Sequence, residues 1–439
     1  MLEDNLKTLF TLEAAADQPL SHVSVPAAAH SARARRRQRR ALTIASPVLA
    51  AAAVIAVIAT SVAFTGGGER IPHPARSATP TAVPVPARWT LLPAAPIAAR
   101  SEYAAVWTGK QMIVWGGYSG TAQYGDGAAY DPATRTWTKI AASPLAGREL
   151  AVTVWTGKDM LIFGGTGNSG APSNGAAYDP AANTWRKLAP IPGSLGGNLT
   201  ASGSYAVWTG KVMLVWGFFG HGGGVHGGGS LAAAAYNPAV NSWTTGTVAP
   251  AQAPLFGDAF WTGKEMIVWG SSAASGSSPG QLEGFGYDPA TGRWSTLPPS
   301  PLGRTGRDSM LDVWTGRLLV VGGGYSPAGL QKDAAAYNPV TNSWLRLPDA
   351  PVGFAGNEVA PDIWTGASVI TIEDGVPGGR PLSLDLTTGR WSLGPKAPVP
   401  GRQEAHELWT GSEVLVWGGG SPSGYGCCSA VERGYSYTP

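Results

Sequence analysis

The sequence predicts an all-β fold, a seven-bladed β-propeller, because three short marks recur along it with a period of about 50 residues. The first mark is the tripeptide Trp-Thr-Gly, whose seven copies begin at Trp107, Trp155, Trp208, Trp261, Trp314, Trp364 and Trp409. The second mark is Tyr followed by Asp-Pro or Asn-Pro, at Tyr130, Tyr178, Tyr236, Tyr287 and Tyr337, with weaker forms at Leu384 and Tyr437. The third mark is a separate tryptophan, at Trp89, Trp137, Trp185, Trp243, Trp294, Trp344 and Trp391.

Each repeat is expected to form one four-stranded sheet, with strands a, b, c and d in chain order. In the first repeat, strand a covers 103–107, strand b covers 111–115, strand c covers 127–130, and strand d begins near Trp137. The Thr-Gly pair falls in the a–b turn, where glycine permits the positive φ of a tight turn. Asp or Asn before Pro suits the c–d turn, because the side chain bonds the backbone and Pro presets φ. In five of six repeats the residue two before the strand-d tryptophan is Asn or Gly, which tolerate the left-handed region.

Strand b ends in an aromatic residue followed by two glycines in three repeats, at Trp115, Phe163 and Trp417. Gly-Gly, then Tyr-Asp-Pro, then a tryptophan resembles the kelch repeat, and the resemblance covers roughly residues 88–439. It implies a kelch-type propeller similar to the central domain of galactose oxidase. The sixth repeat departs most from the pattern, because its strand b (369–374) does not end in Gly-Gly and Leu384 replaces the tyrosine.

The order of the marks also predicts how the ring closes. The repeat region begins with a strand d, marked by Trp89, and ends after a strand c, marked by Tyr437. Pairing the strand near Trp89 with the last repeat would complete a seventh blade from both ends of the domain. This closure removes the open sheet edge that would otherwise favour aggregation.

The residues before the propeller predict a membrane anchor. The formal net charge of +3 comes from an arginine-rich run within 33–40, and the stretch after that run has no charge from Leu42 to Phe64. Twenty-three uncharged residues can cross a bilayer core of about 30 Å, and arginines on their N-terminal side place the tail in the cytoplasm. An arginine run can also bind nucleic acid, but the adjacent apolar segment favours a membrane and no nucleic-acid partner is expected. The predicted organisation is a cytoplasmic tail (1–41), a transmembrane helix (42–64), a linker (65–87) and the propeller (88–439).

A cleaved signal peptide, with Ser61-Val62-Ala63 as its cleavage site, is the alternative to this anchor. The long lead and the long apolar segment favour an uncleaved, single-pass anchor with the propeller outside the cell membrane. Residues 65–87 are rich in Pro, Ala and Thr, which predicts an extended linker. Residues 1–20 place apolar side chains at helical spacing and form either a short helix that binds a cytoplasmic protein or a marginal helix in a disordered tail. Such tails resemble those of membrane proteins from high-GC bacteria.

Ligand binding is expected on the face formed by the b–c and d–a loops, because these loops vary among repeats while the a–b turns barely vary. Four arginines there stand seven residues before a Trp-Thr-Gly tryptophan, and acids lie near them in sequence. Arg and Glu around a channel could bind a sugar or an acidic ligand. The structural alternative, favoured by the recurrence at one register, is that each arginine ties its d–a loop to the next blade. The candidate binding residues are Arg100, Glu102, Arg148, Arg307, Arg402, Glu404 and His406.

Strand a of the later repeats also carries acids close to its tryptophan, at Asp258, Asp312, Asp362 and Glu407. Acids along one side of the channel could bind a cation or a polyol. The sequence favours the other interpretation, in which they form ion pairs between blades with Arg304 or Arg307.

No metal or other cofactor is predicted. His221 and His226 could ligate a metal, but the glycine-rich loop between them supplies no third ligand. The only cysteines, Cys427 and Cys428, are adjacent; outside the cytoplasm they form either a strained vicinal disulfide or two free thiols.

A binding module is favoured over an enzyme. By resemblance, galactose oxidase activity implies a copper held by two Tyr and two His, with one Tyr cross-linked to Cys, and no set of positions here matches that site. Another kelch relative epimerises sialic acid with Arg and acidic residues, for which Arg100, Arg148 and Glu404 would be available. The chain has no nucleophile elbow, phosphate loop or zinc-binding helix motif. The sequence therefore predicts an extracytoplasmic module for a carbohydrate, cell-envelope polymer or protein; the alternatives are a sugar-active enzyme and a transmembrane signalling protein with the propeller as sensor.

Overall fold

The computed structural model describes residues 87–168, 170, 172–192, 204–219, 230–254, 256–272, 280–357, 361–372, 379–398, 402, 404–420 and 433–439. The predicted tail, transmembrane helix and nearly all of the linker lie outside these residues. Within the described part of the chain, no helix is long and apolar enough to cross a membrane.

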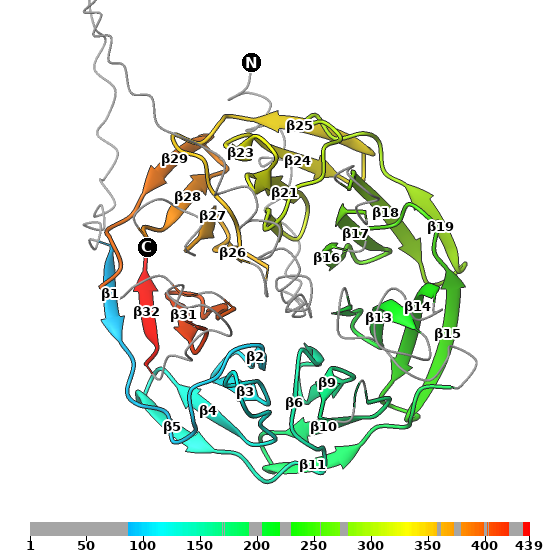
Figure 1. Ribbon diagram of the computed structural model, residues 1–439, viewed down its shortest axis with the longest axis vertical. Helices are drawn as coiled ribbons and strands as arrows, with labels where there is room; N and C mark the ends of the chain where they lie inside the picture. The colour runs from blue at the N-terminus through cyan, green and yellow to red at the C-terminus, as the bar shows by residue number, and fades with distance from the viewer. Residues whose placement is uncertain are drawn as a thin grey trace, which may run out of the picture. The chain divides into compact units, whose positions relative to one another are not determined.

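Seven four-stranded antiparallel sheets stand around a ring in the described residues, which confirms the predicted propeller (Figure 1). We number the blades by the order of their innermost strand, strand a. Blade 1 consists of β2 (Ala104–Trp107), β3 (Met112–Trp115), β4 (Gly127–Asp131) and β5 (Thr136–Lys139). Blade 2 consists of β7 (Val152–Trp155), β8 (Met160–Phe163), β10 (Gly175–Asp179) and β11 (Thr184–Lys187). Blade 3 consists of β12 (Tyr205–Trp208), β13 (Met213–Phe219), β14 (Ser230–Asn237) and β15 (Ser242–Val248).

The remaining blades repeat this order from the centre outward. Blade 4 consists of β16 (Phe256–Trp261), β17 (Met266–Ser271), β18 (Leu282–Asp288) and β19 (Arg293–Thr296). Blade 5 consists of β20 (Leu311–Trp314), β21 (Leu319–Gly322), β24 (Ala334–Asn338) and β25 (Ser343–Leu347). Blade 6 consists of β26 (Ile363–Trp364), β27 (Ser368–Thr371), β28 (Leu382–Asp385) and β29 (Arg390–Leu393). The seventh contains β30 (His406–Trp409), β31 (Val414–Trp417) and β32 (Tyr435–Thr438).

The last blade is completed by β1 (Arg88–Leu91), the first strand of the described chain. It pairs antiparallel with β32, so that Trp89 stands opposite Tyr437 and Arg88 opposite Thr438. The closure predicted from the position of Trp89 is confirmed. In Figure 1 β1, in blue, lies beside β32, in red.

The Trp-Thr-Gly tripeptide builds an identical a–b turn in every blade. In the first copy, the Oγ1 atom of Thr108 accepts hydrogen bonds from the backbone N–H of Lys110 at 3.2 Å and of Gln111 at 2.8 Å, and donates to the Gln111 carbonyl at 3.1 Å. Gly109 follows with a φ of 89°, which glycine adopts without steric cost. The same threonine contacts recur at Thr156, Thr209, Thr262, Thr315, Thr365 and Thr410.

The strand-d tryptophan ties each blade to its neighbour. The indole Nε1 of Trp137 donates to the carbonyl of Pro93, 3.1 Å away, in the segment that follows the preceding strand d. The indole of Trp89 makes the equivalent bond to Pro395, after strand d of blade 6, at 2.9 Å. The same bond is made by Trp185, Trp243, Trp294, Trp344 and Trp391. One indole hydrogen bond per blade therefore links the outer strands of neighbouring blades, and the bond of Trp89 is the seventh.

The c–d turn places a left-handed residue two positions before this tryptophan. Asn183 has a φ of 52°, and its Oδ1 accepts from the Tyr178 hydroxyl and from the Ala141 N–H of the preceding blade, both at 2.8 Å. Arg135 adopts the same conformation, with a φ of 55°, although it is neither Asn nor Gly. The left-handed conformation at this position therefore does not require Asn or Gly. Where the residue is Asn183, its side chain also bonds to the preceding blade.

Blade 6 forms a complete four-stranded sheet despite its divergent sequence. Leu384, which replaces the repeat tyrosine, is fully buried in the cluster between blades 5 and 6 with Val369 and Phe354. An aliphatic side chain thus fills the place of the tyrosine ring, and the Trp391 ring packs against the same cluster.

We predict that removal of β1 destabilises the whole propeller. Trp89→Ala deletes a partly buried indole that donates to Pro395 and packs against Tyr435 and Tyr437, with centroids 4.9 and 4.7 Å away. The expected loss is about 3 kcal/mol of unfolding free energy, measured by chemical denaturation.

Truncation before Ala94 deletes the entire strand, so its effect should exceed that of Trp89→Ala. The control is Arg88→Ala, on the exposed side of the same strand, which should change stability by less than about 0.5 kcal/mol. A truncated protein with an unchanged melting temperature would contradict closure by β1.

Candidate functional site

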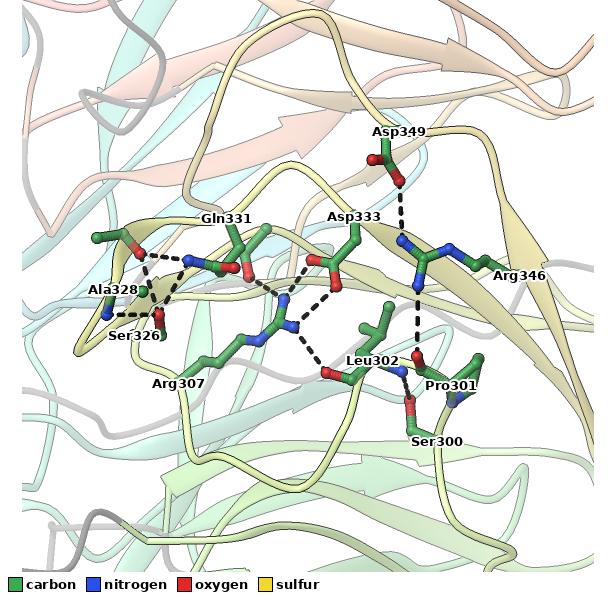
Figure 2. A network of polar contacts seen from close by, with 12 residues as sticks. Ser300, Pro301, Leu302, Arg307, Ser326, Ala328, Gln331, Asp333, Arg346 and Asp349 are labelled. Carbon is green, nitrogen blue, oxygen red and sulfur yellow. Dashed lines mark hydrogen bonds and ion pairs between the residues drawn. The ribbon is translucent and has the colours of Figure 1, made fainter.

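The four recurring arginines of the d–a loops are buried, and each donates to the carbonyl of a glycine that follows strand b of its blade. The Nη1 atom of Arg100 donates to the carbonyl of Gly116 at 3.0 Å and to the carboxylate of Asp126 at 2.7 Å. Arg307 donates to the carbonyl of Gly323 at 3.1 Å and to Oδ2 of Asp333 at 2.9 Å. Figure 2 shows the guanidinium of Arg307 facing the carboxylate of Asp333.

The other two arginines show the same pattern. Arg148 donates to the carbonyl of Gly164 at 3.2 Å and to Oδ1 of Asn174 at 2.9 Å, and burial lowers its pKa to about 10. Arg402 donates to Gly418 at 3.0 Å, and its guanidinium lies over the ring of Tyr435, 4.9 Å from the centroid. Each arginine thus ties a d–a loop to the b–c loop of the blade that follows, as the structural alternative expects.

Three of the four arginine loops are neighbours around the ring. The N–H of Gly419 in blade 7 donates to the Arg100 carbonyl at 2.9 Å, and the N–H of Leu150 in blade 2 donates to the Glu102 carbonyl at 2.9 Å. The loops with Arg402, Arg100 and Arg148 therefore follow one another on blades 7, 1 and 2. The Arg307 loop stands apart on blade 5.

The acids of these loops are buried in strained backbone. Glu102 and Glu404 have φ values of 57° and 61°, and the two residues are only 4% and 5% exposed. Leu150 and Ser309, two residues after their own arginines, share this conformation. The left-handed residue is therefore a feature of the loop itself, which the sequence did not reveal because no Gly or Asn marks it.

His406 lies at the closure of the ring, between blades 7 and 1. Its Nε2 donates to the Tyr103 carbonyl, and its backbone N–H donates to the Tyr103 hydroxyl at 3.1 Å. The Tyr103 hydroxyl donates in turn to the carbonyl of Trp417. Burial lowers the pKa of His406 to about 4, so the ring is neutral at pH 7. The contacts of His406 join the two ends of the repeat array.

The strand-a acids do not form the predicted ion pairs with arginine. Arg304 pairs instead with Glu283, 3.8 Å away, and Arg307 with Asp333. The carboxyl groups of Asp258 and Asp312 hydrogen-bond to each other. The sequence interpretation was wrong because the nearest arginines already have acceptors in their own b–c loops.

Comparison with known proteins agrees with this geometry. The family model of the KLHDC2/KLHL20/DRC7 Kelch-repeats domain matches residues 55–255. A search among curated proteins gave no match. The matched residues include blades 1, 2 and 3, and blades 4–7 repeat their turns and tryptophan contacts.

The protein is a kelch-repeat β-propeller. A kelch propeller suggests a protein-interaction module, since kelch propellers generally mediate interactions between proteins. Among the described residues of this propeller, no group of three or more His, Cys, Asp or Glu side chains could hold a metal ion. His221, His226, Cys427 and Cys428 lie outside the described residues.

We predict that Arg307 stabilises the kelch propeller. Arg307→Ala leaves the mostly buried Asp333, whose side chain is 16% exposed, without its cation. Chemical denaturation should show a loss of about 2–4 kcal/mol, because truncation leaves a buried charge unpaired.

The matched control is Arg346→Ala, because Arg346 and its partner Asp349 have side chains 51% and 42% exposed. Such a surface pair contributes less than about 1 kcal/mol. Equal effects of the two substitutions would contradict the structural assignment of Arg307.

Proposed function

We propose that this kelch propeller is a membrane-anchored binding module that presents its b–c/d–a face to a ligand outside the cytoplasm, without catalysis. The observation that carries the proposal is the contrast between its two faces. The a–b turns share one backbone and one set of threonine bonds, whereas the loops of the opposite face differ from blade to blade. Variable loops on a rigid scaffold are the usual place for recognition.

The differences on this face are built into secondary structure. Strands β13 and β14 run for 7 and 8 residues, whereas β3 and β4 of blade 1 have 4 and 5. In blade 5 the b–c loop folds into its own hairpin of β22 (Tyr325–Ser326) and β23 (Gly329–Leu330). In blade 2 the d–a loop strand β6 (Arg148–Glu149) pairs with β9 (Thr166–Gly167) of the b–c loop. Preformed loops lose less conformational freedom on binding.

In our proposal, the arginines of the d–a loops hold the b–c loops of this face in place. Arg100 is fully buried, while the side chain of its partner Asp126 is 54% exposed; Asn174, the partner of Arg148, is also exposed. The buried guanidinium fixes the loop, and the carboxylate or amide at its surface end is free to accept further bonds from sugar hydroxyls or peptide N–H groups. We therefore propose a carbohydrate, cell-envelope polymer or protein ligand near the loops of blades 7, 1 and 2.

We predict that ligand affinity depends on these loops and not on the opposite face. The soluble fragment from about Pro84 onward is first screened against glycans, cell-wall fragments and peptides. For a ligand found in this way, Arg402→Ala should lower the affinity at least about tenfold, because its loop loses the Gly418 bond.

The control is Lys158→Ala in an a–b turn, where the lysine side chain is 76% exposed. It should leave the affinity unchanged, and circular dichroism checks that both variants are folded. An affinity that depends on Lys110, Lys158 or Lys264 instead would overturn the face assignment.

We also propose that residues 42–64 anchor the chain, with residues 1–20 available to a cytoplasmic protein. We predict that protease added to intact cells removes the propeller and spares the tail, as followed by tags at both ends. The arginine run before Leu42 is the reason, since positive residues stay in the cytoplasm. Protection of the propeller until lysis, or its complete release into the medium, would contradict the anchor.

A further inference from the structure

The innermost strands of four successive blades carry buried acids. Asp258 lies in β16, Asp312 in β20, Asp362 directly before β26, and Glu407 in β30. They are 6%, 5%, 4% and 3% exposed, in that order. We call these four residues the acid row; it crosses the three contacts between blades 4, 5, 6 and 7.

The row is connected by hydrogen bonds between blades. The carboxyl groups of Asp258 and Asp312 bond to each other, which requires a proton because two carboxylates have no donor. The N–H of Asp312 donates to Oδ2 of Asp362 at 3.3 Å, and the N–H of Asp362 donates to the Asp312 carbonyl at 3.3 Å. Among the described residues, Oδ1 of Asp362 and Oε2 of Glu407 are buried without a hydrogen-bond partner.

Cations do not compensate the row in the part of the chain that the structure describes. The charged groups that act on each acid are other acids: Asp312 and Asp362 on Asp258, and Glu407 and Asp312 on Asp362. Their remaining partners are neutral, namely Thr371 beside Asp362 and an Asn357 bond to Glu407.

The neighbouring histidine does not serve as the missing cation. His406 precedes Glu407 in β30, but side chains alternate along a strand, and its ring faces Tyr103 of blade 1, with centroids 4.6 Å apart. Four buried carboxyl groups that no cation of the described residues compensates are stable only when most of them are neutral.

We propose that the acid row is a proton-dependent lock that joins blades 4, 5, 6 and 7 in turn: the propeller folds with protons held on the row, and alkaline pH weakens these contacts. The bond between Asp258 and Asp312 is lost when its shared proton leaves, since two ionised carboxylates side by side repel each other. The lock belongs to the fold and does not depend on the proposed ligand.

The pKa values of the four acids in the row agree with this proposal. Burial raises the pKa of Glu407 to about 8 and that of Asp312 to about 7. Burial raises the pKa values of Asp258 and Asp362 well above the usual range, with the neighbouring acids as a further cause. Because these values exceed those of the unfolded chain, about 4, the stabilisation is complete below pH 4 and is lost as pH rises towards 8.

The lock also reaches the loop face. The N–H of Gly356, in the d–a loop before Asp362, donates to the Ser309 carbonyl at 2.8 Å. A side chain at Gly356 would meet the Asp362 carboxylate at 2.5 Å. Ionisation of the row therefore disturbs the d–a loops of blades 5 and 6.

The test is the number of protons released on unfolding. The full-length protein is unfolded with guanidinium at pH 7 in a weakly buffered solution, and the pH change is converted into protons per molecule. The native row holds protons that the unfolded carboxyl groups cannot keep, so we expect release of at least about one proton. If the natural protein releases no protons on unfolding, or takes protons up, that result alone overturns the proposal.

Three variants assign the protons. Asp258→Asn and Glu407→Gln keep the side-chain shape, and each should lower the release by about one proton and flatten the fall in melting temperature from pH 5 to 8. The control is Asp349→Asn, an exposed acid paired with Arg346, which should release as many protons as the natural protein. Unchanged release in the row variants would assign the protons elsewhere and refute the lock. If a row variant does not fold, the release from the natural protein still decides.

Discussion

The structure depends on the pairing of β1 with β32, which joins the first and last strands of the described chain into one sheet. Every other blade is formed by one continuous stretch of sequence and touches its neighbours through local contacts. Repeat proteins of this kind are held by a sum of nearest-neighbour interfaces. Without β1, blade 7 would lose its outer strand and the ring would present an open edge at Tyr437. The Trp89 indole, bonded to Pro395 in blade 6, makes that strand equivalent to the other six outer strands.

Among the polar contacts between neighbouring blades, two kinds differ in how they depend on pH. On the outer rim, each strand-d tryptophan donates to a carbonyl of the preceding blade, a neutral bond that does not depend on pH. Around the channel, the contacts differ by position: His406 and Tyr103 join blades 7 and 1, whereas the acid row joins blades 4 to 7. Both inner contacts require uncharged side chains, because burial opposes the imidazolium as well as the carboxylates. The inner wall is therefore the part of the fold most sensitive to pH.

Much of the fold could be predicted because its chemistry lies within a few residues of sequence. The threonine and Gly109 of one turn, and Asn183 of another, act on backbone groups close by, so their spacing identifies them. The contacts of Arg100 were less visible, since its acceptor Asp126 stands in a b–c loop that carries no repeated mark. The bond between Asp258 and Asp312 was missed for a related reason: the two lie on different blades, and only their packing brings the two carboxyl groups together. The family of the propeller followed from local marks, whereas its ligand depends on loops that share no pattern.

Amide hydrogen exchange tests the closing strand most directly in the unaltered protein. If the ring stands or falls as a unit, the amides of β1 and β32 should exchange as slowly as those of β30 and β31 in the same blade, through opening of the whole propeller. Fast exchange in β1 and β32 while blades 1 to 6 stay protected would contradict the account, because the ring would then persist without its closing strand.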